Sequence, residues 1–283
     1  MVKSAYCPIT HLAMTAWPTR SWHELLMGMF TACFDASGQE HQHSYIVVAG
    51  FISSAEEWIN FSHKWDEILH NNYSLKAFHA ADCQNYEGEF KSWKGDDTKR
   101  IRLWCDLLEL IKGTVFQKFA CGIEVPAWDK TISKNARMKW KLNAYAMCAL
   151  TCAERVREWA RKESIISPIE YVYESGDPGG GVIIEHLRRE GFPDPSFRHK
   201  YDSFKNGIFV PKFTPLQAAD FLAYETFLTK KILAKKGKPA LGRPIYTFND
   251  MQERARICNA KRLQGMETTF RKSVKVRDLW RFF

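Results

Sequence analysis

The alternation of apolar and polar positions marks an early strand that ends in an acid. Residues 29–38 run through apolar and small side chains to Asp35 and then to the turn pair Ser37-Gly38. The next apolar run, residues 45–51, predicts the antiparallel partner of a hairpin. A carboxylate at the end of a buried strand costs free energy unless a hydrogen bond, a counter-charge or a metal ion compensates it. Asp35 therefore either starts the turn or serves as a functional ligand.

Further elements follow from the spacing of apolar residues. Spacings of three and four predict helices after a cap at Ser53 or Ser54, over 97–112, over 135–163 as the longest, over 182–189, and from Pro215 onward. Alternating runs predict strands over 115–125, 169–174 and 209–213. Helices interleaved with strands predict an α/β fold.

Charge and composition divide the chain into three parts. Residues 1–28 form an irregular lead-in, residues 29–229 the core, and residues 230–283 a basic extension, expected to be helical and to pack on or beside the core. The extension contains 15 Lys and Arg against 4 Asp and Glu, whereas the rest of the chain contains 26 against 28. The whole excess behind the net charge of +9 therefore lies in the last 54 residues.

A basic segment of this kind favours partners rich in phosphate, and its alternative is a solvated tail that aids solubility. Aromatic residues stand among its charges, and such rings either pack in a core or stack on bases. Nucleic acid is therefore the expected partner. The predicted contacts are Lys230, Lys231, Lys235, Lys236, Arg254, Arg262, Arg271 and Lys272.

Several classes of protein are disfavoured by the sequence. No apolar run reaches the roughly 18 residues that span a membrane, and the first 28 residues lack the apolar segment of a signal peptide. The eight cysteines form no Cys-x-x-Cys pair, so a structural zinc site is not expected. We therefore expect a cytoplasmic protein that does not associate with membranes.

Two more acids repeat the placement of Asp35. The apolar run 169–174 ends in Glu174, and the helix that begins at Pro215 carries Asp220 beside a face of small residues suited to packing on a sheet. Carboxylates brought together repel one another unless cations neutralise them, and hard oxygen ligands suit Mg²⁺ or Mn²⁺. Two such ions about 3.5–4 Å apart can activate water and stabilise the leaving oxygen of a phosphodiester.

Three further residues have both a functional and a structural interpretation. His79 is either a metal ligand or proton-transfer group, or a hydrogen-bonded structural histidine. Asp82, three residues later, either joins the site or caps a turn. Asp177, before Pro-Gly-Gly-Gly, is either a turn residue or a further metal ligand.

Four short motifs together resemble a known family. Phe-Asp-x-Ser-Gly, Lys-x-x-His-Ala, Tyr-x-Tyr-Glu and Leu-Gln-x-Ala-Asp-x-x-Ala-Tyr are similar to the bacterial and phage domain of unknown function numbered thirty-eight hundred, over residues 30–229. The resemblance implies an RNase H-like mixed sheet flanked by helices and metal-dependent nuclease chemistry. By position it assigns Asp35, His79, Glu174 and Asp220 to the site of the family.

One position departs from the pattern of the family, which has Asp-Glu-Ser-Gly where this chain has Ala36 in place of the Glu. Neighbouring strand residues point to opposite faces, so a Glu there would not duplicate the role of Asp35. Its loss weakens metal binding, abolishes catalysis, or is compensated by Asp177 or Glu124; the sequence leaves these alternatives open.

The sequence is consistent with three functions. The first is a phosphodiesterase that acts on RNA, DNA or a hybrid with two Mg²⁺ or Mn²⁺ ions, held by Asp35, Glu174, Asp220 and Asp177, with His79 as proton shuttle or phosphate contact. The second is a catalytically weakened module of the same fold that binds nucleic acid or a partner protein. The third is a structural subunit that forms a homo-oligomer through the 135–163 helix.

Overall fold

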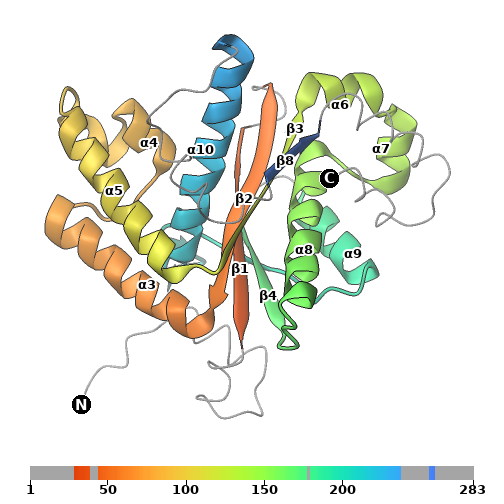
Figure 1. Cartoon of the computed structure of the whole chain (residues 1–283), viewed down its shortest axis with the longest axis horizontal. Helices are drawn as coiled ribbons and strands as arrows, with labels where there is room; N and C mark the ends of the chain where they lie inside the picture. The colour runs from red at the N-terminus through yellow and green to blue at the C-terminus, as the bar shows by residue number, and fades with distance from the viewer. Residues whose placement is uncertain (1–28, 39–43, 177–178, 237–254, 259–283) are drawn as a thin grey trace.

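The computed structural model describes residues 29–38, 44–176, 179–236 and 255–258, and these form an α/β fold with helices on both faces of a mixed sheet (Figure 1). The strands lie in the order β5-β4-β1-β2-β3-β8. They are β1 (Phe30–Ser37), β2 (Tyr45–Ser54), β3 (Gln117–Glu124), β4 (Ile169–Glu174), β5 (Ser196–Arg198) and β8 (Ala255–Cys258). β2 is antiparallel to both of its neighbours, β1 and β3, whereas β4 runs parallel to β1. The predicted α/β class and the first hairpin are confirmed.

The helices form two layers, one on each face of the sheet (Figure 1). One layer contains α3 (Ala55–Glu67), α4 (Ala80–Asn85), α5 (Asp97–Thr114) and α10 (Pro215–Lys236). The other contains α6 (Val125–Thr131), α7 (Lys134–Trp140), α8 (Ala144–Lys162) and α9 (Gly180–Arg189). Alternate residues of β1 enter opposite cores, with Ala32 and Phe34 on the α8 side and Cys33 on the α10 side.

The single helix expected over 135–163 is wrong, because the chain forms α7 and α8 with a break between them. Lys141 has a left-handed φ of 48°, which ends α7. Asn143 then starts α8 by accepting a hydrogen bond from the Ala146 N–H at 2.7 Å. The apolar stripe of α8 packs against β2 and β3, so it is buried within the chain itself.

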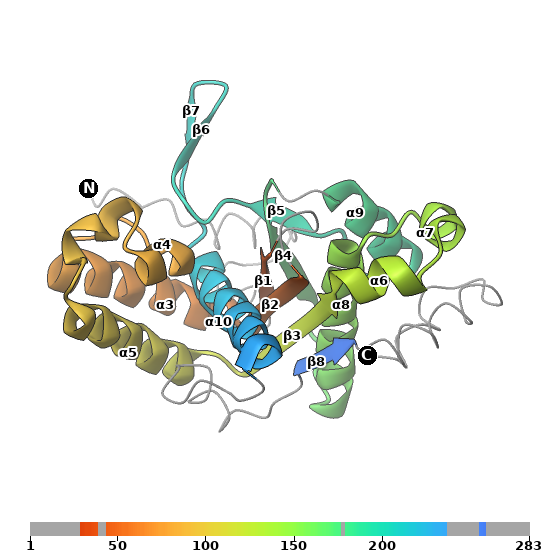
Figure 2. The same cartoon turned by 90° about the horizontal axis from the view of Figure 1, so that it is seen from above.

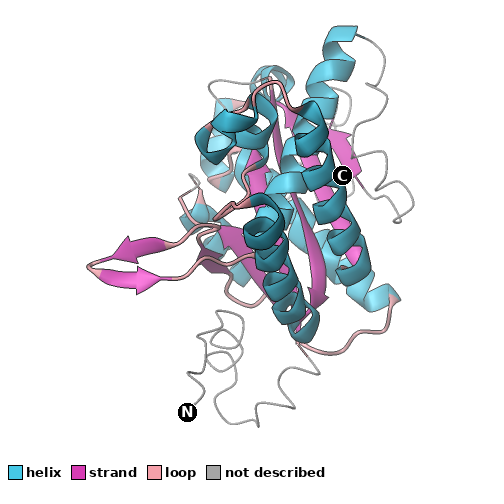
Figure 3. Cartoon of the chain, turned by 90° about the vertical axis from the view of Figure 1, so that its left-hand side faces the viewer, coloured by secondary structure: helices cyan, strands magenta, loops and turns pink. Residues whose placement is uncertain are grey.

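The strand expected over 209–213 is displaced and belongs to a separate hairpin. It is β7 (Ile208–Val210), which pairs with β6 (Ser203–Lys205) through an Asn206-Gly207 turn with φ values of 52° and 78°. Figures 2 and 3 show this hairpin projecting away from the body of the molecule. Phe204, Ile208 and Phe209 are all more than half exposed on it.

Some of the expected parts fall largely outside the described residues. The lead-in 1–28 does so entirely, and the basic extension does so apart from 230–236 and 255–258. α10 runs without interruption through position 230, whereas residues 255–258 of the extension form the strand β8 beside β3 and not the expected helix. Among the helices that the structure describes, none has both the length and the apolar character needed to cross a membrane.

Gly50 permits the close approach of β1 and β2, where it lies opposite Phe34. A Cβ atom at Gly50 would lie 1.8 Å from the carbonyl oxygen of Cys33. We expect Gly50→Ala to separate the two central strands and to lower the free energy of unfolding by about 3 kcal/mol or more, measured by urea denaturation.

Gly113→Ala is the matched control, because a Cβ atom there meets nothing within 4 Å and the residue lies in α5. It should change the free energy of unfolding by no more than about 1 kcal/mol, in the stabilising direction. Equal urea midpoints for the two variants would contradict the register assigned to β1 and β2.

Candidate acidic site

Asp35 stands near the end of β1, on the face that α10 covers. Cys33, two residues earlier on the same face, belongs to the core on the α10 side, and the Asp35 residue is only 4% exposed. Its Oδ1 accepts a hydrogen bond from the Ala36 N–H at 2.7 Å. The Ala36 side chain packs toward the α8 side, so a glutamate at that position would start from the opposite face of the sheet.

Asp220 approaches Asp35 from α10. The helix packs on β1 and β2, and the small residues Ala219 and Ala223 beside Asp220 are fully buried. The Asp220 residue is 5% exposed, and its Oδ2 accepts the Ala80 N–H at 2.7 Å. The expectation that this acid lies near the sheet surface is therefore confirmed.

Lys200 joins the two acids and was not predicted. Its Nζ donates to Asp35 Oδ2 at 2.5 Å and to Asp220 Oδ1 at 3.1 Å, and its side chain is 11% exposed. Burial by itself lowers the pKa of Lys200, but the charges of Asp220 and Asp35 outweigh it and raise that pKa above its ordinary value. No sequence pattern distinguishes this residue among the 41 Lys and Arg residues of the chain.

Glu174 contacts the backbone of the same lysine. Because Phe34 pairs with Tyr173 in parallel register, Glu174 at the end of β4 is level with Asp35. Its Oε2 accepts the Lys200 N–H at 3.1 Å, and its Oε1 lies 3.9 Å from Nδ1 of His199. The structure thus brings all three predicted acids to Lys200, two through its ammonium group and one through its backbone.

Gln217 holds the segments around the site in place and is fully buried. Its Oε1 accepts hydrogen bonds from Trp65 Nε1 at 2.9 Å and from the Phe78 N–H at 2.8 Å. Its Nε2 donates to the Lys200 carbonyl oxygen at 2.8 Å. One amide of α10 therefore positions α3, the segment before α4 and the segment that carries Lys200.

His79 lies between two carboxylates just before α4. Its Nδ1 is 3.0 Å from Asp82 Oδ1, and its Nε2 is 3.8 Å from Asp220 Oδ1. About a third of each of the His79 and Asp82 side chains is exposed, at 34% and 35%. The structure therefore places the predicted histidine at the solvent side of the acids, with Asp82 orienting its ring.

Tyr201 completes the site and was also missed from the sequence. Its hydroxyl oxygen is buried and has no hydrogen-bond partner among the described residues. Its ring stands at 90° to that of His79, with centroids 6.1 Å apart. Burial, followed by the charge of Asp220, raises the pKa of Tyr201, so the hydroxyl keeps its proton and remains a donor.

None of the remaining predicted residues is placed at the acidic site by the part of the chain that the structure describes. Glu124 ends β3, which lies two strands away from β1. The residue of β3 that is level with Asp35 is Ala120, four positions before Glu124, so Glu124 is not part of the acidic site. Lys230 and Lys231 lie on α10, as do Lys235 and Lys236, whose side chains are not described. Asp177, Arg254, Arg262, Arg271 and Lys272 lie outside the described residues.

The acidic site contains ligand atoms of the kind that bind divalent cations, although its described residues are not arranged as a complete metal centre. Within the described ranges, no group of three or more His, Cys, Asp or Glu side chains is arranged to hold a metal. However, oxygens from Asp35 and Asp220 converge on one cationic nitrogen, and carboxylate oxygens are the ligands that Mg²⁺ and Mn²⁺ prefer. Asp35 and Asp220 are the residues that would hold the ion.

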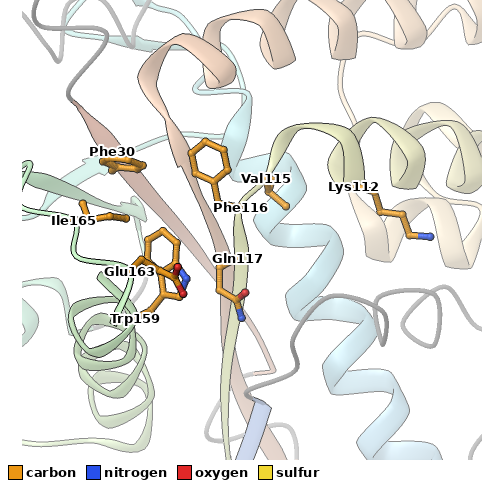
Figure 4. A pocket seen from close by; sticks show the side chains of 8 residues that line it. All are labelled: Phe30, Lys112, Val115, Phe116, Gln117, Trp159, Glu163 and Ile165. Carbon is orange, nitrogen blue, oxygen red and sulfur yellow. The ribbon is translucent and has the colours of Figure 1, made fainter. Parts of the chain in front are cut away.

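A pocket of about 610 Å³ lies at the other end of β1, where Phe30 lines it (Figure 4). Its remaining lining residues are Lys112, Val115, Phe116, Gln117, Trp159, Glu163 and Ile165. None of the site residues described above lines this pocket. The acidic site and this pocket are therefore separate features.

Comparison of the chain with protein-family models, with curated proteins and with solved structures found no match. The function is therefore argued from the geometry of the acidic site.

Gln217→Leu should destabilise the protein, because it removes the partners of the Trp65 indole, the Phe78 N–H and the Lys200 carbonyl group. Buried polar groups left without partners cost about 1–3 kcal/mol each, so we expect a loss of about 3 kcal/mol in the free energy of unfolding, measured by urea denaturation. Thr229→Val on the same helix is the control, since the buried Thr229 hydroxyl has no partner among the described residues. Equal unfolding midpoints for both variants would show that the Gln217 bonds do not stabilise the site.

Proposed function

We propose that this protein is a metal-dependent phosphodiesterase that acts on nucleic acid through an RNase H-like core. The observation that carries the proposal is the convergence of Asp35 and Asp220 on one cation position. Two carboxylates that are 4% and 5% exposed require a positive charge between them, and a phosphodiester substrate requires one as well.

The architecture supports this proposal. Asp35 lies near the end of β1, which has a strand on each side, and Glu174 ends the parallel neighbour β4. Asp220 lies on α10, which packs across both β1 and β2. A mixed sheet with helices on both faces is also what the sequence motifs imply (Figure 1). Acids on rigid strands and a packed helix hold their positions better than acids on loops.

In the proposed reaction, a water molecule adds to the phosphorus atom while the bond from phosphorus to the leaving sugar oxygen breaks. A bound Mg²⁺ or Mn²⁺, or a pair of them, would neutralise phosphate charge and stabilise the leaving oxygen. Asp35 and Asp220 would bind the ion, with Glu174 beside them. His79 accepts the proton of the attacking water, and Asp82 stabilises the resulting imidazolium; solvent supplies a proton to the leaving oxygen.

The β6–β7 hairpin is the proposed binding surface for single-stranded nucleic acid. It begins three residues after Lys200. Phe204 and Phe209 lie directly opposite each other in its register, with ring centroids 5.6 Å apart and exposures of 75% and 53%. Lys205, next to Phe204, is exposed as well. Exposed rings beside a basic residue suit the stacking of bases and contact with phosphates.

The basic extension is the proposed second contact with nucleic acid. Its charge favours phosphate partners, and affinity gained in this way falls as salt rises. Lys230 and Lys231 begin this segment within α10, the helix that also carries Asp220.

A second candidate function is a binding module of the same fold without catalysis. Two observations favour it: Ala36 replaces the glutamate of the family motif, and the Lys200 ammonium group already pairs with both Asp35 and Asp220. Such a module would bind nucleic acid in a salt-sensitive manner, and its binding would not need a divalent ion.

Cleavage of labelled single-stranded RNA and DNA, duplexes and hybrids in Mg²⁺, Mn²⁺ or EDTA distinguishes the two candidates. We expect metal-dependent cleavage that Asp220→Asn slows by at least about a hundredfold, because the variant loses one metal-binding carboxylate. Asp66→Asn is the control, since Asp66 also pairs with a lysine, Lys212 at 2.7 Å, but lies outside the acidic site. Salt-sensitive binding without cleavage in either metal would establish the binding module.

The combined variant Phe204→Ala and Phe209→Ala should weaken the binding of single-stranded nucleic acid by about tenfold or more, because it removes two stacking surfaces. Fluorescence anisotropy with a labelled oligonucleotide at fixed salt measures the change. Ile166→Ala is the control, because Ile166 is 98% exposed and lies away from the hairpin in the turn after α8. Unchanged affinity in the double variant would exclude the hairpin from substrate binding.

A further inference from the structure

The strongest unexplained feature of the acidic site is the ammonium group at its centre. Lys200 Nζ lies 2.5 Å from Asp35 Oδ2 and 3.1 Å from Asp220 Oδ1, which are hydrogen-bond distances to both acids at once. We propose that Lys200 is the resident cation of this site and competes with a divalent ion for the position between Asp35 and Asp220. This inference rests on the proposed metal-dependent function and adds a mechanism that would regulate it.

Geometry makes the two cations mutually exclusive at this position. The carboxylate oxygens that contact the ammonium nitrogen are the ones that a divalent ion would need, and a cation between them leaves no room for a second. Two positive centres at such short range would also repel strongly, since the surroundings are largely closed to water. Entry of the ion therefore requires the Lys200 side chain to withdraw.

The lysine is positioned for this role by its backbone. The Glu174 carboxylate accepts the Lys200 N–H, and the Gln217 amide donates to the Lys200 carbonyl oxygen. These bonds hold the main chain while the four-carbon side chain remains able to change rotamer. A phosphate group of the substrate would offer the displaced ammonium a new anion, so substrate binding would favour entry of the metal.

The chain also provides a matched lysine for comparison. Lys212 lies at the other end of the β6–β7 hairpin, and its side chain is 11% exposed, as is that of Lys200. It pairs with a single carboxylate, that of Asp66, at 2.7 Å. Its bonds go to Asp66 and to the Lys76 carbonyl oxygen, so it serves neither Asp35 nor Asp220. Removal of its charge therefore tests the general effect of losing a buried lysine.

The experiment is a Mn²⁺ titration of the full-length wild type, Lys200→Met, Lys200→Arg and Lys212→Met, without nucleic acid. Electron paramagnetic resonance measures the concentration of free Mn²⁺, and calorimetry measures the heat of binding. Lys200→Met should bind Mn²⁺ with a dissociation constant about tenfold or more below that of the wild type, because no ammonium group must be displaced. Lys200→Arg keeps a cation and Lys212→Met keeps Lys200, so both should match the wild type.

Thermal unfolding in EDTA and in Mn²⁺ gives a second readout. Without metal, Lys200→Met removes the ammonium charge between two buried carboxylates and should melt below the wild type. Added Mn²⁺ should raise its melting temperature by more than it raises that of the wild type. If Lys200→Met does not stay folded in EDTA, Lys200→Gln, purified in Mn²⁺ and dialysed to set concentrations, replaces it in both measurements.

The outcomes separate the two proposals. Equal Mn²⁺ affinity in the wild type and in Lys200→Met would overturn the competition and leave the metal site standing. Tighter binding in Lys212→Met as well would overturn it too, because the effect would then be one of general charge. Absence of Mn²⁺ binding at millimolar concentration in both the wild type and Lys200→Met would overturn the metal site and with it the proposed function.

Discussion

The ion triplet of Asp35, Lys200 and Asp220 is the interaction on which the arrangement of the site depends. It joins β1, the segment after β5 and α10, which are separated by up to 185 positions in the chain. Removing one member of a buried charge set costs about 3–5 kcal/mol, because the remaining charges lose their compensation. The same contacts that hold these elements together also define a position for a cation. Under the proposed function, stability and activity would therefore be linked at one point, and a change in cation occupancy would alter both.

The surrounding fold is arranged to make that contact available. Gly50 lets β2 approach β1 closely, and the small residues of α10 let the helix lie directly on these two strands. Gln217 then fixes the backbone of Lys200 and the segment before His79. A buried amide with three partners is a rigid connector, because each unmade bond would leave a polar group unsatisfied. The groups that face the acids are thus positioned by buried bonds, while His79 and the projecting hairpin face the solvent.

The two candidate functions draw on different features of the acidic site. Its carboxylate oxygens are ligands of the kind that Mg²⁺ and Mn²⁺ prefer, whereas the ammonium group between them offsets part of their charge without an added ion. The proposed competition between lysine and metal would reconcile these features, since one site would then exist in a lysine-filled and a metal-filled state. Ala36 packs on the other face of the sheet, so its side chain takes no part in the contact between Asp35 and Lys200.

The sequence by itself determined the α/β class, the first hairpin, the helix that carries Asp220 and the acids that converge on the site. These follow from local periods of two and three to four residues and from turn and capping residues, which act over short stretches of chain. It did not determine the break at Lys141, because the apolar stripe continues on both sides of the Asn143 cap. Only the tertiary structure selected Lys200 and Tyr201, since what distinguishes them is burial beside charges contributed by distant segments. Local pattern encodes which face of an element is apolar, whereas the partner of a buried charge is decided by packing.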